Sequence, residues 1–243
     1  MADWNDPNTW AKAYGIRGGR PNKMDIPGGF SIGAGFGEDL SYLDGRKFTL
    51  QYSDDGLSGL AKTRYALQKL EGAGFTPASE TLVVGCGFGW SIELIVDAGS
   101  NNVWGSDTSS LIHAGIIDPN VGVRSDIQPL IFNINIEDPD AKDQFLSVAA
   151  GTNKGEFRTI LTEHVLEGIP QVDIPSFLSS CTDLLVSGQS RVYHMIIAMD
   201  AIDDPNLIDS DIIENQWTLS EWTAFNPTHY WIDSITGAFG GGQ

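Results

Sequence analysis

Short apolar runs alternate with helix-like stretches through the middle of the chain. Apolar runs of strand length lie at residues 81–84, 103–106, 130–136, 157–162 and 191–199. Two of the stretches between them, residues 91–98 and 174–185, carry apolar side chains at the spacing of an amphipathic helix. Strands that alternate with helices in this way form a parallel sheet with helices on both faces. The pattern predicts a doubly wound α/β domain.

The segment before this domain has a different character. Residues 1–40 are irregular in pattern and include eight glycines. Residues 40–53 alternate like a hairpin around the turn Asp44-Gly45. We therefore expect a glycine-rich arm with a hairpin over residues 1–53 and the α/β domain over residues 54–243.

Three further signals concern the ends of the domain. A helix is expected over residues 57–70, ended by glycines that include Gly74. Thr218-Leu-Ser-Glu221 has the form of a capping box and predicts a short helix. Residues 229–232 predict a late strand, antiparallel at the edge of the sheet.

The charge is strongly acidic and unevenly placed. Residues 1–75 hold 9 basic and 9 acidic side chains, whereas residues 76–243 hold 5 basic and 23 acidic ones, which gives the whole net charge of −18. Proteins that bind a nucleic-acid backbone use Lys and Arg to displace its counterions. A nucleic-acid substrate is therefore disfavoured for the main domain, and the acidity is typical of a solvated surface.

Cysteine content and apolar stretches bear on location. The chain has two cysteines, Cys86 and Cys181, too few for a disulfide framework. It has no apolar stretch long enough to cross a membrane, and its first residues lack the pattern of a secretory signal. No Cys/His cluster has metal-ligand spacing. We expect a cytoplasmic protein with no membrane segment and no bound metal.

The most informative feature is the glycine turn after the first apolar run. Gly85-Cys86-Gly87-Phe88-Gly89 follows residues 81–84, and the next apolar run stops on Asp107, 18 residues after Gly89. A β-α-β unit of this form binds the nucleoside part of a cofactor, with backbone groups at the turn and the carboxylate on the ribose hydroxyls.

The spacing of the glycines separates the candidate cofactors. A dinucleotide site has Gly-x-Gly-x-x-Gly, but here the third glycine comes one residue early and Trp90 stands in its place. No Gly-Lys-Ser/Thr follows, which excludes a Walker loop. An NAD-dependent reductase is therefore disfavoured. Gly-x-Gly-x-Gly instead resembles the first motif of the class I S-adenosylmethionine-dependent methyltransferases, which have a Rossmann-like fold.

The resemblance covers roughly residues 57–200 in the order of the family's motifs. Residues 105–110 resemble the family's second-strand end, 157–168 its fourth-strand segment and 187–194 the loop into its fifth strand. The resemblance implies S-adenosylmethionine as the cofactor. Its binding residues would be Gly85, Cys86, Gly87 and Gly89 around the methionine part, Asp107 on the ribose, and Thr108 beside the adenine.

Two positions depart from the family pattern. Val83 stands where the family usually has an acid that contacts the methionine ammonium, and Arg158 replaces an acid that commonly opens the fourth strand. The first departure concerns the tightness of cofactor binding. Neither conflicts with the fold.

Candidate polar groups follow the third and fourth apolar runs. Glu163 and His164 stand where the fourth strand should end, at the edge where α/β sites form, and are the candidate proton acceptors. The alternative is that they cap the next turn. Glu137 or Asp138 would accept a hydrogen bond from the adenine amino group, with a solvated turn as the alternative. His194, inside an apolar strand, is expected to be a core residue.

The methyl acceptor is narrowed by what the sequence lacks. The Asp/Asn/Ser-Pro-Pro-aromatic motif of amino-methylating DNA enzymes is replaced by Thr162-Glu-His-Val165, and neither cysteine follows a proline. We therefore expect methyl transfer to a small molecule or a protein side chain, with the arm supplying acceptor contacts. The rival reading is a methyltransferase-derived fold that serves as a non-catalytic binding or assembly module, with the arm as the surface for assembly.

Overall fold

The computed structural model describes the sheet and most of the elements around it. The described residues are Asp3, Asn5, Leu67, Leu70, 74–87, 89–113, 126–148, 157–163, 165–186, 190–195 and 217–224. The expected hairpin at 40–53, most of the expected helix at 57–70 and the late strand at 229–232 lie outside them. The assignment of residues 1–53 as a separate arm stays a prediction.

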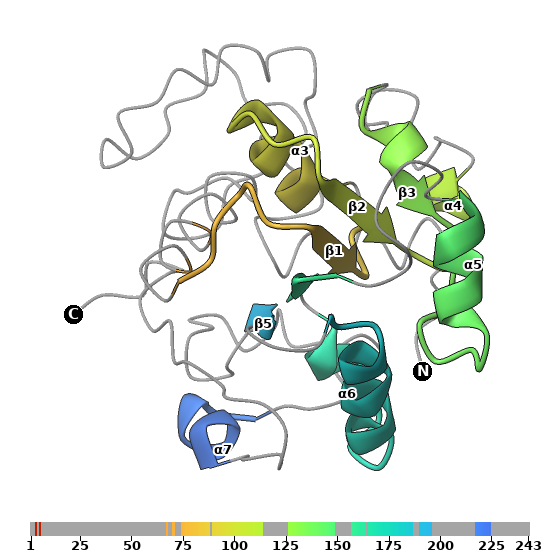
Figure 1. The fold of residues 1–243 in the computed structure, drawn as a ribbon. Coiled ribbons are helices and arrows are strands. Elements are labelled where there is room, and N and C mark those ends of the chain that lie inside the picture. The colour runs from red at the N-terminus through yellow and green to blue at the C-terminus, as the bar shows by residue number, and fades with distance from the viewer. Residues whose placement is uncertain are drawn as a thin grey trace, which may run out of the picture.

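The described strands form one five-stranded parallel sheet in the order β3-β2-β1-β4-β5 (Figure 1). The strands are β1 Thr81–Val84, β2 Val103–Ser106, β3 Ile131–Phe132, β4 Thr159–Glu163 and β5 Arg191–Met195. The predicted parallel α/β architecture is confirmed, and β1 and β2 have the predicted bounds. The antiparallel late strand is not supported: every strand pairing in the described residues is parallel, and residues 229–232 lie outside them.

The helices lie in the connections between strands and after the sheet. They are α3 Trp90–Asp97, α4 Ser110–His113, α5 Ala141–Val148, α6 Ile174–Asp183 and α7 Leu219–Ala224, with 3-10 turns η3 Gln128–Leu130 and η4 Leu166–Gly168. The helices predicted at 91–98 and 174–185 correspond to α3 and α6. The sequence pattern did not predict α4 or α5.

Helices cover both faces of the sheet. Leu82 and Val84 of β1 belong to a buried cluster with Phe145 of α5 and Phe177 of α6. Neighbouring residues of a strand point to opposite faces. On the other face, a Cβ added to Gly105 would meet Ile92 of α3. Since both faces are covered, all four residues of β1 are buried, as is usual for the strands of a parallel sheet.

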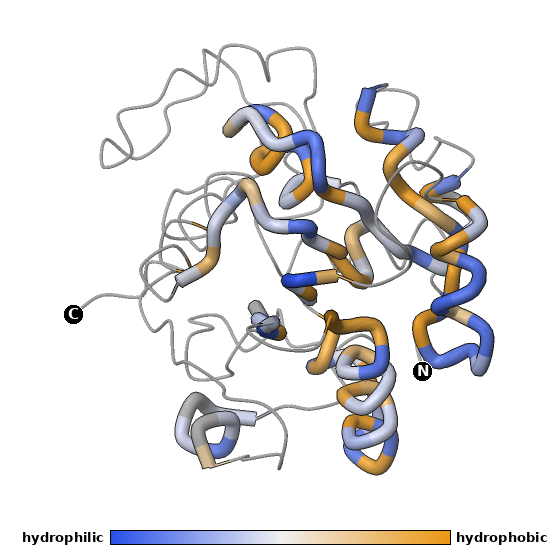
Figure 2. The backbone as a smooth tube through the Cα atoms, viewed as in Figure 1, coloured by the Kyte–Doolittle hydropathy of each residue, from blue (hydrophilic) through white to orange (hydrophobic). Residues whose placement is uncertain are grey.

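The helix α5 shows why the pattern missed it. Its buried side chains are Ala141 and Phe145, one helical turn apart. Hydrophilic residues make up much of α5 and its flanking turns in Figure 2. A stripe this narrow gives a weak periodic signal. Phe145 nevertheless anchors the helix, with its ring edge-on to Phe157 at 5.5 Å between centroids.

The strand β3 is shorter than the predicted run of 130–136. It pairs with β2 only at Ile131 and Phe132, because β2 ends at Ser106 and the chain then turns into α4. Alternation continues past the last paired residue: Ile134 and Ile136 are buried, and Asn133 and Asn135 are exposed. The predicted strand is therefore present in part, and the end of the neighbouring strand sets its length.

Two predicted helix boundaries are confirmed. Gly74 has φ of 96°, and the N–H of Phe75 donates to the carbonyl of Leu70 at 2.9 Å, the pattern of a glycine-ended helix. At the other end of the chain, the N–H of Thr218 donates to Glu221 Oε2 at 2.7 Å, and the N–H of Glu221 donates to Thr218 Oγ1 at 3.3 Å. This capping box opens α7.

The strand order places the expected site. The chain builds β1, β2 and β3 outward in one direction and then returns to place β4 on the other side of β1. Ligands of open α/β sheets bind outside the carboxyl ends of the strands at such a switch point. The switch point here lies between β1 and β4.

Candidate functional site

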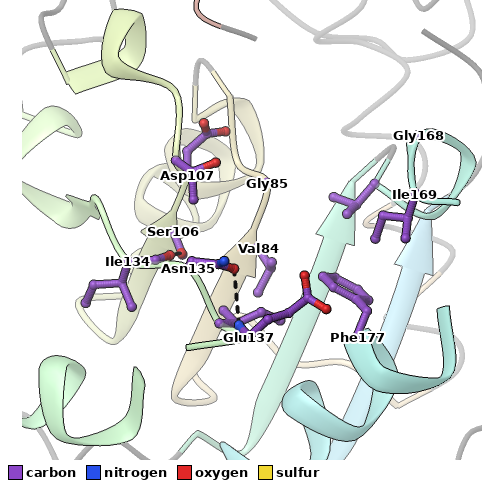
Figure 3. A pocket seen from close by; sticks show the side chains of 13 residues that line it. Val84, Gly85, Ser106, Asp107, Ile134, Asn135, Glu137, Gly168, Ile169 and Phe177 are labelled. Carbon is purple, nitrogen blue, oxygen red and sulfur yellow. Dashed lines mark hydrogen bonds between the residues drawn. The ribbon is translucent and has the colours of Figure 1, made fainter. Parts of the chain in front are cut away.

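A cavity of about 210 Å³ lies at the carboxyl ends of the first four strands (Figure 3). Its lining comes from the end of β1, the end of β2, the chain after β3, the chain after β4, and α6. The lining residues are Val84, Gly85, Ser106, Asp107, Thr108, Ile134, Asn135, Ile136, Glu137, Val165, Gly168, Ile169 and Phe177. The cavity therefore occupies the switch point of the sheet.

The glycine turn forms the edge of this cavity. Gly85, Gly87 and Gly89 have φ of 64°, 51° and 75°, a left-handed conformation that glycine adopts readily. The turn aims backbone N–H groups at the end of β2: Gly85 donates to the Ser106 carbonyl at 2.8 Å, and Gly87 donates to Asp107 Oδ2 at 2.9 Å. The turn thus fixes Asp107 in place.

Asp107 is held at both carboxylate oxygens. Its Oδ2 accepts the N–H of Gly87, and its Oδ1 accepts the N–H of Ser109 at 2.8 Å. The side chain is 9% exposed and lines the cavity. The arrangement fits a ligand that brings hydroxyl donors, such as a ribose.

Two of the glycines also serve packing within the chain. A Cβ on Gly85 would overlap Cγ2 of Val165, in the chain after β4. A Cβ on Gly89 would lie 3.0 Å from Cγ2 of Ile127. The absence of a side chain at Gly89 therefore allows the start of α3 to pack against the chain before η3. In the same way, Gly85 allows the chain after β4 to pack against the glycine turn.

The chain after β3 carries two polar side chains into the cavity. The N–H of Glu137 donates to Asn135 Oδ1 at 3.1 Å, and Glu137 Oε1 accepts a hydrogen bond from Ser176 Oγ of α6 at 3.3 Å. In Figure 3 the Glu137 carboxylate reaches toward Phe177. Sequence reasoning missed Asn135, although the alternation of residues 133–137 places it on the same side as Glu137.

Four predicted binding residues are absent from the lining of the cavity: Cys86, Gly87, Gly89 and Asp138. Cys86 is 4% exposed, and its N–H donates to the Ser106 carbonyl at 3.2 Å. Asp138 donates its N–H to the Asn135 carbonyl and accepts that of Ala141, both at 3.0 Å, which shapes the turn into α5. Thr108 lies in the lining. Glu137, and not Asp138, is the acid that faces the cavity.

The wall opposite the polar groups is apolar. Val165 and Ile169 follow β4, and Phe177 comes from α6. Cavities with an apolar lining and a few placed polar groups are typical of small-molecule sites. Among the described residues that line the cavity, none is Lys or Arg. The described lining therefore offers no cationic side chain to a phosphate.

The two candidate proton acceptors are Glu163 and His164. Glu163 is the last residue of β4 and pairs in register with Met195. The side chain of Glu163 and the whole of His164 lie outside the described residues, so their roles stay predictions. Val165, one residue further on, lines the cavity.

His194 is a buried core residue, as predicted. It is 8% exposed, and its Nδ1 lies 2.7 Å from Thr162 Oγ1 of the neighbouring strand. Burial lowers the pKa of His194 to about 4, so the imidazole is neutral at pH 7. Burial, and then the charge of Glu137, raises the pKa of the Cys181 thiol well above its ordinary value. The described residues contain no group of three His, Cys, Asp or Glu that could hold a metal ion.

The two departures from the family pattern lie in different places. Val83 is fully buried in β1. Arg158 lies just before β4, at the amino end of the sheet, where its Nε is 3.6 Å from Glu80 Oε2. Arg158 therefore lies at the edge of the sheet opposite the cavity.

Searches against known proteins give similarities in fold only. No protein-family model matches the chain, and no curated protein matches its sequence. Among the part of the chain that is described, no helix is long and apolar enough to span a membrane.

Several methyltransferases are among the similar solved structures. One is the plantazolicin methyltransferase BpumL in complex with a pentazolic desmethylPZN analog and SAH, at 17% identity and a TM-score of 0.42, over 68% of this chain and 59% of that one. Another is the glycopeptide N-methyltransferase MtfA complexed with S-adenosyl-L-homocysteine, at 12% identity and a TM-score of 0.42, over 60% of this chain and 55% of that one. A third is magnesium protoporphyrin IX methyltransferase (ChlM) from Synechocystis PCC 6803 with bound SAH. Its identity is 18% and its TM-score 0.37, over 52% of this chain and 51% of that one.

This chain covers between about half and three fifths of the length of these structures. All three TM-scores are below 0.5, so the fold assignment rests on the chain's own features. Those features are the parallel pairing, the strand order and the glycine turn that holds the acid after β2. The described part of the chain has a doubly wound, Rossmann-like α/β fold.

Proposed function

We propose that the chain binds S-adenosylmethionine and transfers its methyl group to a small molecule or a protein side chain. The observation that carries this proposal is Asp107, fixed by the N–H groups of Gly87 and Ser109 at the edge of a cavity at the switch point. An acid at this position of a β-α-β unit takes ribose hydroxyls.

The residues after β3 suit the adenine of such a cofactor. Asn135 Oδ1 accepts the N–H of Glu137. The side-chain NH2 of Asn135 can then act as a donor to a ligand, and the Glu137 carboxylate as an acceptor. Adenine presents an amino donor beside ring-nitrogen acceptors. Asn135 and Glu137 together therefore match an adenine edge, and Thr108 would lie beside the ring.

The cofactor supplies an activated methyl group on a sulfonium. The task of the chain is then to align the acceptor and to exclude water. The apolar side chains of Val165, Ile169 and Phe177 suit the second task. Glu163 or His164 would accept a proton from an acceptor that carries one. An acceptor other than nucleic acid and a cytoplasmic location belong to the same proposal. The first rests on the acidic composition, and the second rests on the low cysteine content.

Calorimetry with S-adenosylmethionine and S-adenosylhomocysteine tests the proposal. Both should bind, and Asp107→Ala should weaken them by about 100-fold, because two hydrogen bonds to a charged group are lost. Asp107→Asn keeps an acceptor and should lose less. Asp183→Ala, an exposed acid at the end of α6, is the matched control. NAD and ATP should not bind. Failure of both S-adenosyl ligands to bind would contradict the proposal.

Val83 favours one rival function, that of a non-catalytic binding or assembly module. An apolar side chain, fully buried, stands where the family has an acid for the methionine ammonium. The rival predicts weak or absent cofactor binding and no transfer of a labelled methyl group to any acceptor pool. Transfer that Asp107→Ala abolishes would decide for the enzyme.

A further inference from the structure

A segment distant in sequence is bonded to the loop that carries the cofactor acid. Asn5 Oδ1 accepts two hydrogen bonds from Ser110, one from its N–H and one from its Oγ, both at 2.8 Å. The two residues are 105 positions apart. The N–H of Asn5 donates to Asp3 Oδ1 at 3.0 Å, so Asn5 is also held by Asp3.

Ser110 is the first residue of α4, which begins three residues after Asp107. The first N–H groups of a helix have no partner within the helix and need acceptors from elsewhere. Asp107 supplies an acceptor to Ser109, and Asn5 supplies one to Ser110. Two consecutive N–H groups are thus held, one by the cofactor acid and one by a distant segment.

We propose that Asn5 is a positioning residue of the cofactor cavity. By holding the first turn of α4, it fixes the loop of residues 107–109, in which Asp107 and Thr108 line the cavity. The inference rests on the proposed function. Coupling between two sites is reciprocal, so a ligand bound at Asp107 also stabilises the docking of the segment around Asn5.

The size of the effect is bounded by the other contacts of α4. His113 Nε2 lies 2.5 Å from the Asp107 carbonyl, and the N–H of Ile112 donates to the Ser109 carbonyl at 3.2 Å. These contacts remain when Asn5 is replaced. The loss of Asn5 should therefore loosen the loop and weaken the ligand without abolishing the site.

Calorimetry with S-adenosylhomocysteine gives the first measurement. Asn5→Ala should weaken binding about three- to tenfold, the range that the net worth of one or two neutral hydrogen bonds gives. Asn5→Asp keeps an acceptor for Ser110 and should restore most of the affinity. Asn102→Ala is the matched control, because Asn102 lies just before β2 at the opposite end of the sheet.

Amide hydrogen exchange gives a second measurement that a purely structural role would not reproduce. In the ligand-free protein, Asn5→Ala should speed exchange at the Ser110 amide. In the wild type, S-adenosylhomocysteine should slow exchange in the peptide that contains Asn5. Ligand binding that is equally tight in Asn5→Ala, with no protection of that peptide, overturns the positioning role alone. If neither S-adenosylmethionine nor S-adenosylhomocysteine binds the wild type, both the proposed function and the coupling are contradicted.

Discussion

The two walls of the cavity are built differently. The wall from β2 and β3 presents Asp107, Asn135 and Glu137, each held by a backbone N–H group or a neighbouring side chain. The wall from β4 and α6 presents Val165, Ile169 and Phe177, which pack on the core. Under the proposed function the first wall recognises the ligand, whereas the second packs on the core. Substitutions in the second should therefore change stability, and substitutions in the first should change binding.

The largest expected effect lies in the apolar wall. Phe177 is 4% exposed in the core, so Phe177→Ala should lower the free energy of unfolding by about 3–5 kcal/mol, through lost burial and the cavity left behind. Phe177→Leu, which keeps most of the volume, should cost clearly less. Urea unfolding measures both. Equal losses from the two variants would show that packing is not what this ring contributes.

The contact between the glycine turn after β1 and the apolar wall comes next. Gly85→Ala should destabilise by about 2–4 kcal/mol, because it adds an overlap with Val165 to the cost of a left-handed alanine. Gly99→Ala is the matched control: Gly99 has φ of 92°, but a Cβ there meets nothing within 4 Å. The difference in melting temperature between the two variants isolates the overlap. The double variant with Val165→Ala should recover part of it.

The pH dependence of stability tests whether water is excluded from His194, in the sheet behind the apolar wall. Thr162 and His194 stand in register with Val84, which lines the cavity. The pKa of His194 is lowered by burial to about 4 from an ordinary value of 6.5. Between these values the unfolded chain binds the proton first, so stability is fully present above pH 6.5 and falls as the pH drops toward 4, by up to about 3 kcal/mol.

Chemical denaturation from pH 7 to pH 4 measures this loss. His194→Asn retains a polar partner for Thr162 and lacks the titrating group. The difference in the free energy of unfolding between the wild type and this variant should therefore decrease toward pH 4. Carboxylates that titrate in the same range are common to both and cancel. An unchanged difference across the range would mean that His194 is hydrated in the folded protein.

The smallest effect on stability, and the sharpest contrast with Phe177, is expected at Asn135. This side chain is exposed, so Asn135→Ala should change the free energy of unfolding by less than about 0.5 kcal/mol. If the proposed function holds, the same change should weaken S-adenosylhomocysteine several-fold, because an adenine contact is lost. A large loss of stability with unchanged binding would reverse the roles assigned to the two walls.

The sequence was most informative where one local unit determines the structure. The glycine turn, α3 and the acid after β2 could be predicted because a β-α-β unit brings its own ends together. The full length of β3 could not, because the end of its neighbour sets it. The contact of Val165 with Gly85 depends on how β4 is placed beside β1. The pairing of Asn5 with Ser110 joins residues 105 apart and leaves no periodic signal.

The burial of Cys86 and Cys181 has a practical consequence for labelling. The chain has no other cysteine, and these two are 4% and 0% exposed. Thiol reagents act on the accessible thiolate, so both native cysteines should react slowly and need not be removed. Val172, 84% exposed just before α6, offers a position for a single introduced cysteine. A fluorophore there would report how the apolar wall responds when a ligand enters.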